Sequence, residues 1–157
     1  MNTKIKYIFS DIDGVLTDGK VRIDINGNET KEICYRDLDS VAMGRQQGLE
    51  FIFVTGEDTI MARQIVKRFK AAAAEYGAKD KLMAVQKLLQ TFNISRDEVC
   101  YIGDSNRDVP AIAFAGFGVA PSDASPKARK AAAFVTETQG GSGVLFEVVE
   151  KILDNQA

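Results

Sequence analysis

Residues 8–19 read IFSDIDGVLTDG, and this stretch decides the fold that we expect for the whole chain. Apolar residues run directly into Asp11 and Asp13, which stand two positions apart, and Gly14 follows at once. This pattern is typical of a buried strand that ends in a ligand-binding loop, because ligands of open α/β sheets bind beyond the carboxyl ends of the strands. A polar turn after a buried strand would show it too. The other motifs have to distinguish a turn from a catalytic pair of carboxylates.

The chain alternates short apolar segments with longer amphipathic ones. The apolar segments predict strands at residues 5–9, 50–54, 99–102, 117–120 and 133–135, with a weaker, alanine-rich candidate at 71–76. Apolar residues at helical spacing predict helices over 58–69, over 81–92 and from an N-cap near Ser142 onward. This alternation indicates an α/β fold, a Rossmann-like three-layer sandwich with a central parallel sheet, and the length favours a single domain over residues 1–157.

One segment departs from this alternation. Residues 21–25 and 30–36 read as two strands on either side of Asn26-Gly27, a pair typical of hairpin turns. We therefore expect a β-hairpin insert at about residues 20–36. Because the insert follows the acidic motif, it should project from the same end of the sheet as that motif.

Composition excludes several classes of function. The formal net charge is -2 and there is no basic tract, which argues against a nucleic-acid or membrane partner. The chain contains no histidine, so Ser-His-Asp triads, histidine phosphatases and histidine-ligated zinc are excluded. Cys34 and Cys100 stand far apart, and the N-terminal apolar run is too short for a signal peptide, so a reduced, cytoplasmic setting is expected. Catalysis would have to use carboxylates, Lys, Thr and a hard metal.

Residues suited to phosphate chemistry lie at four places where a parallel sheet would expose strand ends. They are Asp11 with Asp13, Thr55 with Gly56, Lys81 at the start of a helix, and Gly103-Asp104 with Asp108. Each motif alone has an ordinary explanation as a turn, a cap or a solvated helix residue. Gathered at one edge, they fit a carboxylate that accepts a phosphoryl group while Mg²⁺, an ammonium group and a hydroxyl offset the charges. A second acid nearby can protonate the leaving oxygen and later activate water.

The combination resembles the haloacid dehalogenase superfamily of phosphotransferases over nearly the whole chain. SDIDGVLTDG is similar to its opening motif, VTGE to its threonine motif, KDK to its lysine motif and GDSNRD to its metal motif. The resemblance implies Asp11 as nucleophile and Asp13 as general acid/base, with Thr55 and Lys81 holding the phosphoryl group. It implies Mg²⁺ bound by Asp11, the backbone carbonyl of Asp13 and Asp104. Asp108 would support the metal's water shell or Lys81, and Gly56 and Ser105 would also support the site.

Within that superfamily, DGVLTDG, the hairpin, Arg36-Asp37 and GGSGV at 140–144 resemble the capless sugar-acid phosphatases. These enzymes hydrolyse 3-deoxy-D-manno-octulosonate 8-phosphate or the 9-phosphates of nonulosonates such as ketodeoxynononate, and a relative is fused to some sialic acid cytidylyltransferases. The resemblance makes Thr17 and Glu57 candidates for substrate binding, although a helix's first turn would also favour Glu57. Four departures from the pattern, expected near the sugar, are Leu38, Ser40, Ser105 and Ser142.

The motifs stand too close together in the sequence to leave room for a cap domain. Capless relatives assemble as tetramers, in which hairpins line a shared barrel and a neighbour covers each site. The resemblance therefore implies a homotetramer with shared active sites. Arg63 and Arg68, on the helix after Thr55, are candidates for binding a substrate carboxylate in a neighbour's site. Two solvated helix residues explain these arginines equally well.

Two other functions stay open at this point. Response-regulator receivers also combine acids, Thr, Lys and Mg²⁺, but their nucleophile lies on a later strand than the acidic pair and their Lys comes last. Here Asp11 comes first, and Asp13 is placed to speed hydrolysis, which a signalling domain should avoid. A capless phosphatase of a macromolecule or of another sugar phosphate would also suit an open site, and a monomer in solution would favour it.

Overall fold

A six-stranded parallel sheet forms the centre of the computed structural model, which describes residues 4–157. The strand order is β5-β4-β1-β6-β7-β8. The strands are β1 (Tyr7–Ser10), β4 (Glu50–Val54), β5 (Ala73–Glu75), β6 (Val99–Ile102), β7 (Phe117–Ala120) and β8 (Phe134–Val135). The predicted parallel sheet is confirmed, and β1, which leads into the acidic motif, pairs with β4 and β6 in its interior.

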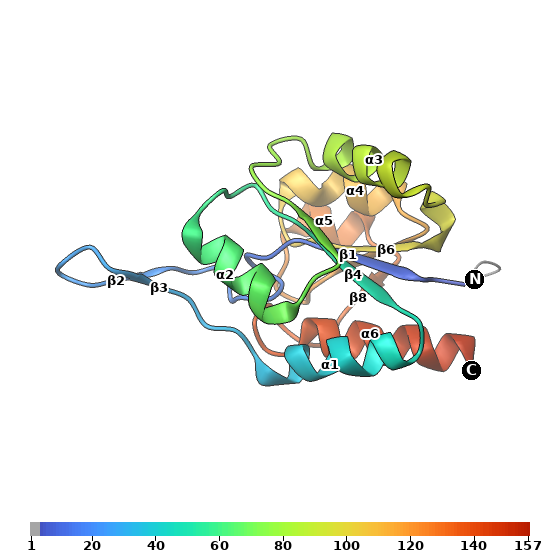
Figure 1. Cartoon of the computed structure of the whole chain (residues 1–157), viewed down its shortest axis with the longest axis horizontal. Helices are drawn as coiled ribbons and strands as arrows, with labels where there is room; N and C mark the ends of the chain where they lie inside the picture. The colour runs from blue at the N-terminus through green and yellow to red at the C-terminus, as the bar shows by residue number, and fades with distance from the viewer. Residues whose placement is uncertain (1–3) are drawn as a thin grey trace.

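Helices cover both faces of this sheet, which makes the predicted three layers (Figure 1). One face carries α1 (Tyr35–Gln46), α2 (Ile60–Phe69) and α6 (Val144–Gln156). The other carries α3 (Lys81–Phe92), α4 (Val109–Phe114) and α5 (Pro126–Ala131). Short 3-10 turns, η1 (Arg96–Glu98) and η2 (Asn106–Asp108), flank β6. None of the helices in the described part of the chain is long and apolar enough to cross a membrane.

Each central strand supplies side chains to two separate hydrophobic cores. Phe51 and Phe53 of β4 pack with α1, α2 and α6, whereas Ile52 and Val54 pack with α3 and its neighbours. This follows from the period of two in a strand. Because both faces are covered, both sets must be apolar, and this explains why the strands read as unbroken apolar runs.

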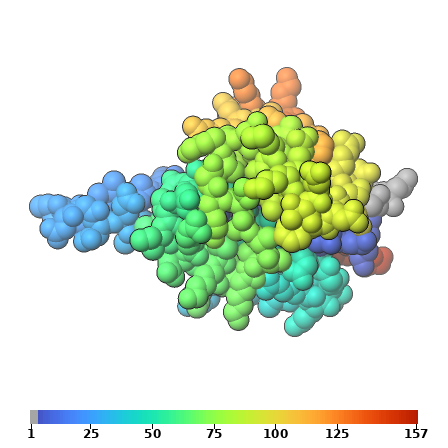
Figure 2. All heavy atoms as spheres, turned by 45° about the horizontal axis from the view of Figure 1, so that its top comes forward, coloured from blue at the N-terminus to red at the C-terminus, as the bar shows by residue number. Residues whose placement is uncertain are grey.

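The predicted hairpin is present but its strands are shorter than expected. β2 (Arg22–Ile23) and β3 (Glu29–Thr30) pair antiparallel, and the hairpin stands clear of the body at the carboxyl end of β1 (Figures 1 and 2). Gly27 has a φ of 82°, and the Asp24 carboxylate accepts the N–H groups of Asn26 and Asn28. The predicted strand over 30–36 is corrected, since the chain leaves the hairpin after β3 and enters α1, which buries apolar surface that a longer projecting strand would expose.

The start of α6 also differs from the prediction. Ser142 does not cap this helix, because α6 begins at Val144 and its N-cap is Gly143. Gly143 has a φ of 110°, a conformation that other residues rarely adopt. The N–H of Phe146 is instead bound by Asp37 of α1, whose Oδ1 lies 3.0 Å from that nitrogen. The α6 N-terminus is thus capped by a carboxylate that is distant in the sequence.

This buried cap should make stability depend on pH. Burial raises the pKa of Asp37 from 3.8 to about 6, although the N–H groups of Phe146 and Leu145 oppose the shift. The folded pKa lies above the unfolded one, so the folded state binds the proton more tightly. The free energy of unfolding should therefore fall by roughly 2 kcal/mol as pH rises from about 4 to about 7.

Urea unfolding of wild type and Asp37→Asn across that pH range isolates this contribution. The other titratable groups give both proteins the same pH dependence of stability, which cancels in the difference. We expect the variant to gain stability relative to wild type as pH rises. A difference that stays constant with pH would contradict a raised pKa of Asp37.

Candidate active site

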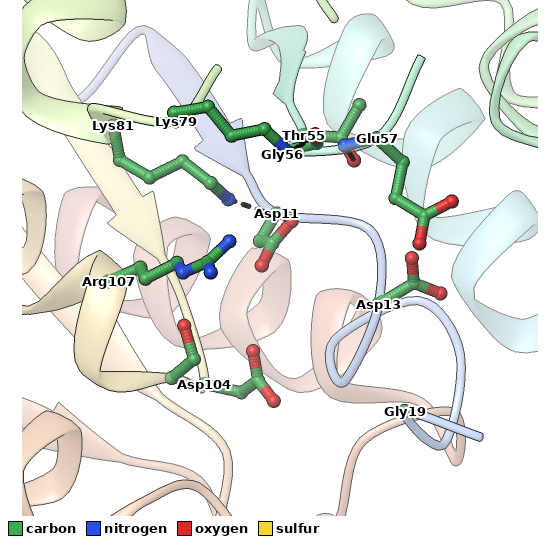
Figure 3. Close-up of a pocket in the computed structure, with 11 residues that line it drawn as sticks. Asp11, Asp13, Gly19, Thr55, Gly56, Glu57, Lys79, Lys81, Asp104 and Arg107 are labelled. Carbon is green, nitrogen blue, oxygen red and sulfur yellow. Dashed lines mark hydrogen bonds and ion pairs between the residues drawn. The ribbon is translucent and has the colours of Figure 1, made fainter. Parts of the chain in front are cut away.

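A pocket of about 370 Å³ opens at the carboxyl ends of the central strands (Figure 3). Its walls include Asp11 and Asp13 after β1, Thr55 after β4, Lys81 at the start of α3 and Asp104 after β6. These residues are distant in the sequence, and the parallel sheet brings them together as its topology predicts.

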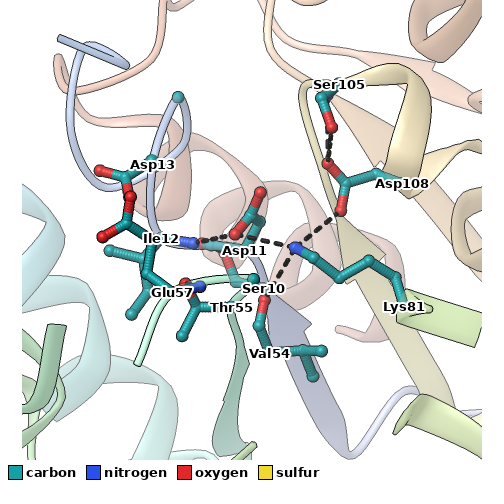
Figure 4. Close-up of polar contacts among 12 residues, drawn as sticks. Ser10, Asp11, Ile12, Asp13, Val54, Thr55, Glu57, Lys81, Ser105 and Asp108 are labelled. Carbon is teal, nitrogen blue, oxygen red and sulfur yellow. Dashed lines mark hydrogen bonds and ion pairs between the residues drawn. The ribbon is translucent and has the colours of Figure 1, made fainter. Parts of the chain in front are cut away.

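Lys81 is fixed at the base of this pocket by contacts with two carboxylates (Figure 4). Its Nζ lies 3.0 Å from Oδ1 of Asp11 and 3.3 Å from Oδ1 of Asp108, and it donates to the carbonyl oxygen of Val54 at 3.1 Å. The Lys81 side chain is only 3% exposed. The ammonium group is therefore held beside Asp11 by partners on three different segments.

Burial sets the charge states in the pocket. It raises the pKa of Asp11 from 3.8 to about 7, even though the charge of Lys81 acts against the shift. Burial also acts to lower the pKa of Lys81, but the charges of Asp11 and Asp108 outweigh it, so the pKa is raised. Desolvation, with the charge of Asp108, raises the pKa of Asp104 to about 6. The cluster of acids therefore favours further positive charge.

Asp108 supports the site from behind. One oxygen accepts a hydrogen bond from the Tyr101 hydroxyl at 2.7 Å and contacts Lys81. The other accepts hydrogen bonds from the N–H and the Oγ hydroxyl of Ser105 at 3.1 and 3.0 Å. Asp108 is fully buried. Both of its carboxylate oxygens are thus already engaged, one of them with Lys81.

Oxygen ligands for a hard cation meet at the pocket floor. Carboxylate oxygens of Asp11, Asp104 and Asp108 all lie within 4.8 Å of one another. Since Asp108 is engaged elsewhere, Asp11 and Asp104 are the carboxylates that could hold a divalent ion. Gly14 is required here: its φ is 85°, and a Cβ at this position would lie 1.9 Å from Oδ2 of Asp104. The donor set fits the predicted cation.

Asp13 is held by two residues at the side of the pocket. Its carboxylate accepts the Thr17 hydroxyl at 3.1 Å and lies 2.9 and 3.0 Å from Nζ of Lys31. Thr17 is fully buried and also accepts the N–H groups of Gly14 and Gly19. Thr17 does not line the pocket in the structure, and a role for it in substrate binding stays a prediction. No local pattern pointed to Lys31, which follows β3 and meets Asp13 only in the folded chain.

The remaining substrate-binding candidates separate into two groups. Glu57 lines the pocket, and its carboxylate points toward Asp13 (Figure 3). Arg63 lies outside, ion-paired with Asp58 at 2.6 Å and stacked over the Tyr76 ring at 4.1 Å from its centroid. Arg68 lines a different hollow, between α1 and α2. A role for Arg63 or Arg68 in a neighbour's site stays a prediction.

The four departures from the family pattern do not gather around the pocket as expected. Only Ser105 lines it. Leu38 packs against a hydrophobic core, the Ser40 hydroxyl donates to the Asp37 carbonyl at 2.7 Å, and Ser142 is exposed. Leu38 and Ser40 belong to α1, which packs on α6. That expectation is corrected for Leu38, Ser40 and Ser142.

Two lining cations were not singled out from the sequence. Lys79 and Arg107 both border the pocket. Lys79 belongs to the KDK motif at 79–81, and Arg107 belongs to the GDSNRD motif at 103–108. Their places in these motifs, close to Lys81 and Asp108, were the sequence signal that could have identified them.

Fold and site together define a phosphoryl-transfer hydrolase of the haloacid dehalogenase type. A family profile described as haloacid dehalogenase-like hydrolase matches residues 75–148. The curated 3-deoxy-D-manno-octulosonate 8-phosphate phosphatase of Haemophilus influenzae is 30% identical over 152 residues, covering 97% of this chain and 84% of that protein. The chain therefore belongs to the haloacid dehalogenase superfamily and, within it, to the capless sugar-acid phosphatase family; it is a phosphatase.

Solved structures agree with this assignment. The Moraxella catarrhalis 3-deoxy-D-manno-octulosonate 8-phosphate phosphatase, in complex with magnesium ion, phosphate ion and KDO, is similar at a TM-score of 0.91 and 31% identity, covering 96% of this chain and 86% of that one. The cobalt-bound Haemophilus influenzae enzyme has a TM-score of 0.91 and 30% identity, covering 98% and 90%. The resemblance stated from the sequence motifs is confirmed.

Proposed function

We propose that this protein is a Mg²⁺-dependent phosphatase of a phosphorylated 2-keto-3-deoxy sugar acid, either octulosonate 8-phosphate or a nonulosonate 9-phosphate. The observation that carries the proposal is the buried contact between Asp11 and Lys81 at the base of a pocket that Asp13 and Asp104 also line. The substrate class is supported by the relatives that are named for octulosonate 8-phosphate.

We assign the following roles to the site residues. An oxygen of Asp11 attacks phosphorus, the ester P–O bond breaks, and Asp13 gives its proton to the leaving sugar oxygen. Asp13 then takes a proton from water, which hydrolyses the aspartyl-phosphate and regenerates Asp11. Lys81 and Thr55 hold the phosphoryl oxygens, helped by backbone at Gly56. Glu57 faces the part of the pocket that the sugar would enter.

Mg²⁺ is the cofactor that we propose for this site. Asp11, Asp104 and the backbone carbonyl of Asp13 would hold it, with Ser105 and Asp108 as support. When bound, the ion supplies positive charge that offsets Asp11 and the incoming phosphoryl group.

A phosphate-release assay tests the proposal. Octulosonate 8-phosphate, ketodeoxynononate 9-phosphate, N-acetylneuraminate 9-phosphate and a panel of hexose phosphates are compared by kcat/KM, each with Mg²⁺ and with EDTA. We expect one sugar-acid phosphate to exceed the hexose phosphates by at least about 100-fold, because unpaired polar groups in the pocket penalise a poor fit. Equal turnover of the hexose phosphates would overturn the substrate class, and turnover in EDTA would overturn the metal requirement.

We further propose a homotetramer with shared active sites. The hairpin projects away from the body (Figure 2) and exposes Ile23 to 63% and Ile25 completely. Apolar side chains on a short, isolated hairpin favour contact with another chain.

Deleting residues 22–30 should impair assembly and sugar-phosphate turnover together. A gentler variant, Ile25→Asp, leaves Lys31 in place and should shift the mass measured by light scattering toward smaller species. Asn28→Ser, at the same hairpin, is the matched control. A truncated protein that stays tetrameric and fully active would contradict shared sites, and a wild-type monomer would favour a macromolecular substrate.

We also propose the cytoplasm as the location of the protein. Cys34 and Cys100 are both free thiols, which suits a reducing compartment. Fractionation of the producing cells would test this location.

A further inference from the structure

Arg107 is a lining residue with no assigned role. It belongs to η2, directly after β6, and its side chain enters the pocket from the side opposite Glu57 (Figure 3). The guanidinium group points toward Asp11, the group to which phosphorus would be transferred.

The other cations of the pocket already have partners. Lys81 is bound to Asp11, Asp108 and the Val54 carbonyl. Lys79 donates to the Gly56 carbonyl at 3.1 Å. Within residues 4–157, Arg107 makes no hydrogen bond and no ion pair, and it is exposed. Its positive charge is therefore available for an anionic ligand.

The Arg107 side chain also reaches across the pocket to the loop after β4, which carries Thr55 and Gly56. Its Nη1 lies 4.0 Å from the point that a Cβ on Gly56 would occupy. Gly56 follows Thr55, which is buried and lines the same pocket. A group that enters above Asp11 would thus meet Thr55 and Gly56 on one side and the guanidinium on the other.

The charge balance explains why a further cation is needed. The pocket is lined by Asp11, Asp13, Glu57 and Asp104, and the charge of Lys81 is already shared between two carboxylates. Mg²⁺, Lys79 and Lys81 would together offset these four carboxylates and leave the two negative charges of a phosphate dianion without a partner. The planar guanidinium fork can donate two parallel hydrogen bonds to one phosphoryl group.

We propose that Arg107 is a further catalytic residue that binds two phosphoryl oxygens of the substrate, opposite Thr55 and Gly56, and partly covers the site of a protein that has no cap domain. The inference rests on the proposed phosphatase function but not on the identity of the sugar. It differs from a carboxylate-binding role, in which Arg107 would contact the other end of a sugar acid.

The experiment compares wild type, Arg107→Ala and Arg107→Lys in Mg²⁺-loaded protein. Calorimetry measures the Kd of inorganic phosphate, and p-nitrophenyl phosphate, which has no carboxylate, gives kcat/KM. We expect Arg107→Ala to weaken phosphate binding and to lower kcat/KM by about 10- to 100-fold each, since a charge-assisted hydrogen bond is lost. Arg107→Lys should recover part of both. Arg129→Ala, which removes another exposed arginine outside the pocket, is the control and should match wild type.

Two outcomes would overturn the inference. Unchanged phosphate binding and unchanged ester hydrolysis in Arg107→Ala would show that Arg107 does not contact the phosphoryl group. Weaker binding of the dephosphorylated sugar acid, with phosphate binding intact, would assign Arg107 to the carboxylate. If wild type itself binds no phosphate and hydrolyses neither ester nor sugar phosphate, the proposed function fails first, and Arg107 has no phosphoryl group to bind.

Discussion

Asp11→Asn should lower kcat/KM by at least about 10⁴-fold, because an amide cannot form the acyl-phosphate bond and removal of a nucleophile commonly has effects of this size. The substitution keeps the shape of the side chain. Its oxygen can still accept the Ile12 N–H, which lies 2.7 Å from Oδ1 of Asp11 in the structure. The loss should therefore be chemical and not a failure to fold.

Stability provides the control for this prediction. Burial raises the pKa of Asp11 to about 7, so ionising this carboxyl destabilises the metal-free fold as pH rises through about 4 to 7. Asp11→Asn avoids that penalty and should be at least as stable as wild type at about pH 8 in EDTA, measured by urea unfolding. Asp39→Asn, an exposed acid on α1, is the matched charge control. Residual turnover within tenfold of wild type would remove Asp11 as nucleophile.

Lys81→Met should affect activity and stability together. The change leaves Asp11 and Asp108 buried without their shared cation, and the Asp108 side chain is fully buried. Removing one partner of a buried ion pair typically destabilises a fold by about 3–5 kcal/mol. We expect a loss of that order in metal-free buffer, where no bound ion can compensate, and a fall in kcat/KM of at least about 10³-fold with Mg²⁺ because a phosphoryl-binding cation is lost.

A double variant separates the two effects of Lys81. Asp108→Asn added to Lys81→Met removes one unpaired charge and keeps an oxygen for the Tyr101 hydroxyl, which donates to Asp108 at 2.7 Å. We expect urea unfolding to show recovered stability while activity stays low. If activity returned with stability, Lys81 would act only as a structural counter-ion.

Much of the fold could be predicted because its signals are local. β4, β6 and β7 begin and end where the apolar runs do, and α3 spans the predicted residues 81–92. The hairpin strands were overestimated because alternating residues after β3 look like a strand, whereas no neighbouring strand pairs with them in the structure. α4 and α5 were not delimited in the sequence, since each is only six residues long and leaves little periodicity to detect.

The residues of the candidate site also include some that the sequence predicted and some that it did not. Asp11, Asp13, Thr55, Lys81 and Asp104 all line one pocket, which agrees with their predicted places at the strand ends. Of the substrate-binding candidates, Glu57 lines the pocket and Thr17 does not, because side-chain direction in a loop depends on its packing. Thr17 is the example: its hydroxyl is used within the loop that holds Asp13.

The amino-acid sequence by itself determined the parallel α/β architecture, the order of the motifs and the phosphatase family, because strand and helix periodicity and short motifs are properties of neighbouring residues. Only the tertiary structure decided which distant groups meet. The cap that Asp37 provides for α6, the ion pair between Lys31 and Asp13, and the reach of Arg107 toward Gly56 each join segments far apart in the chain. Such contacts depend on how the helices and loops pack on the sheet, and no local pattern of residues encodes that packing.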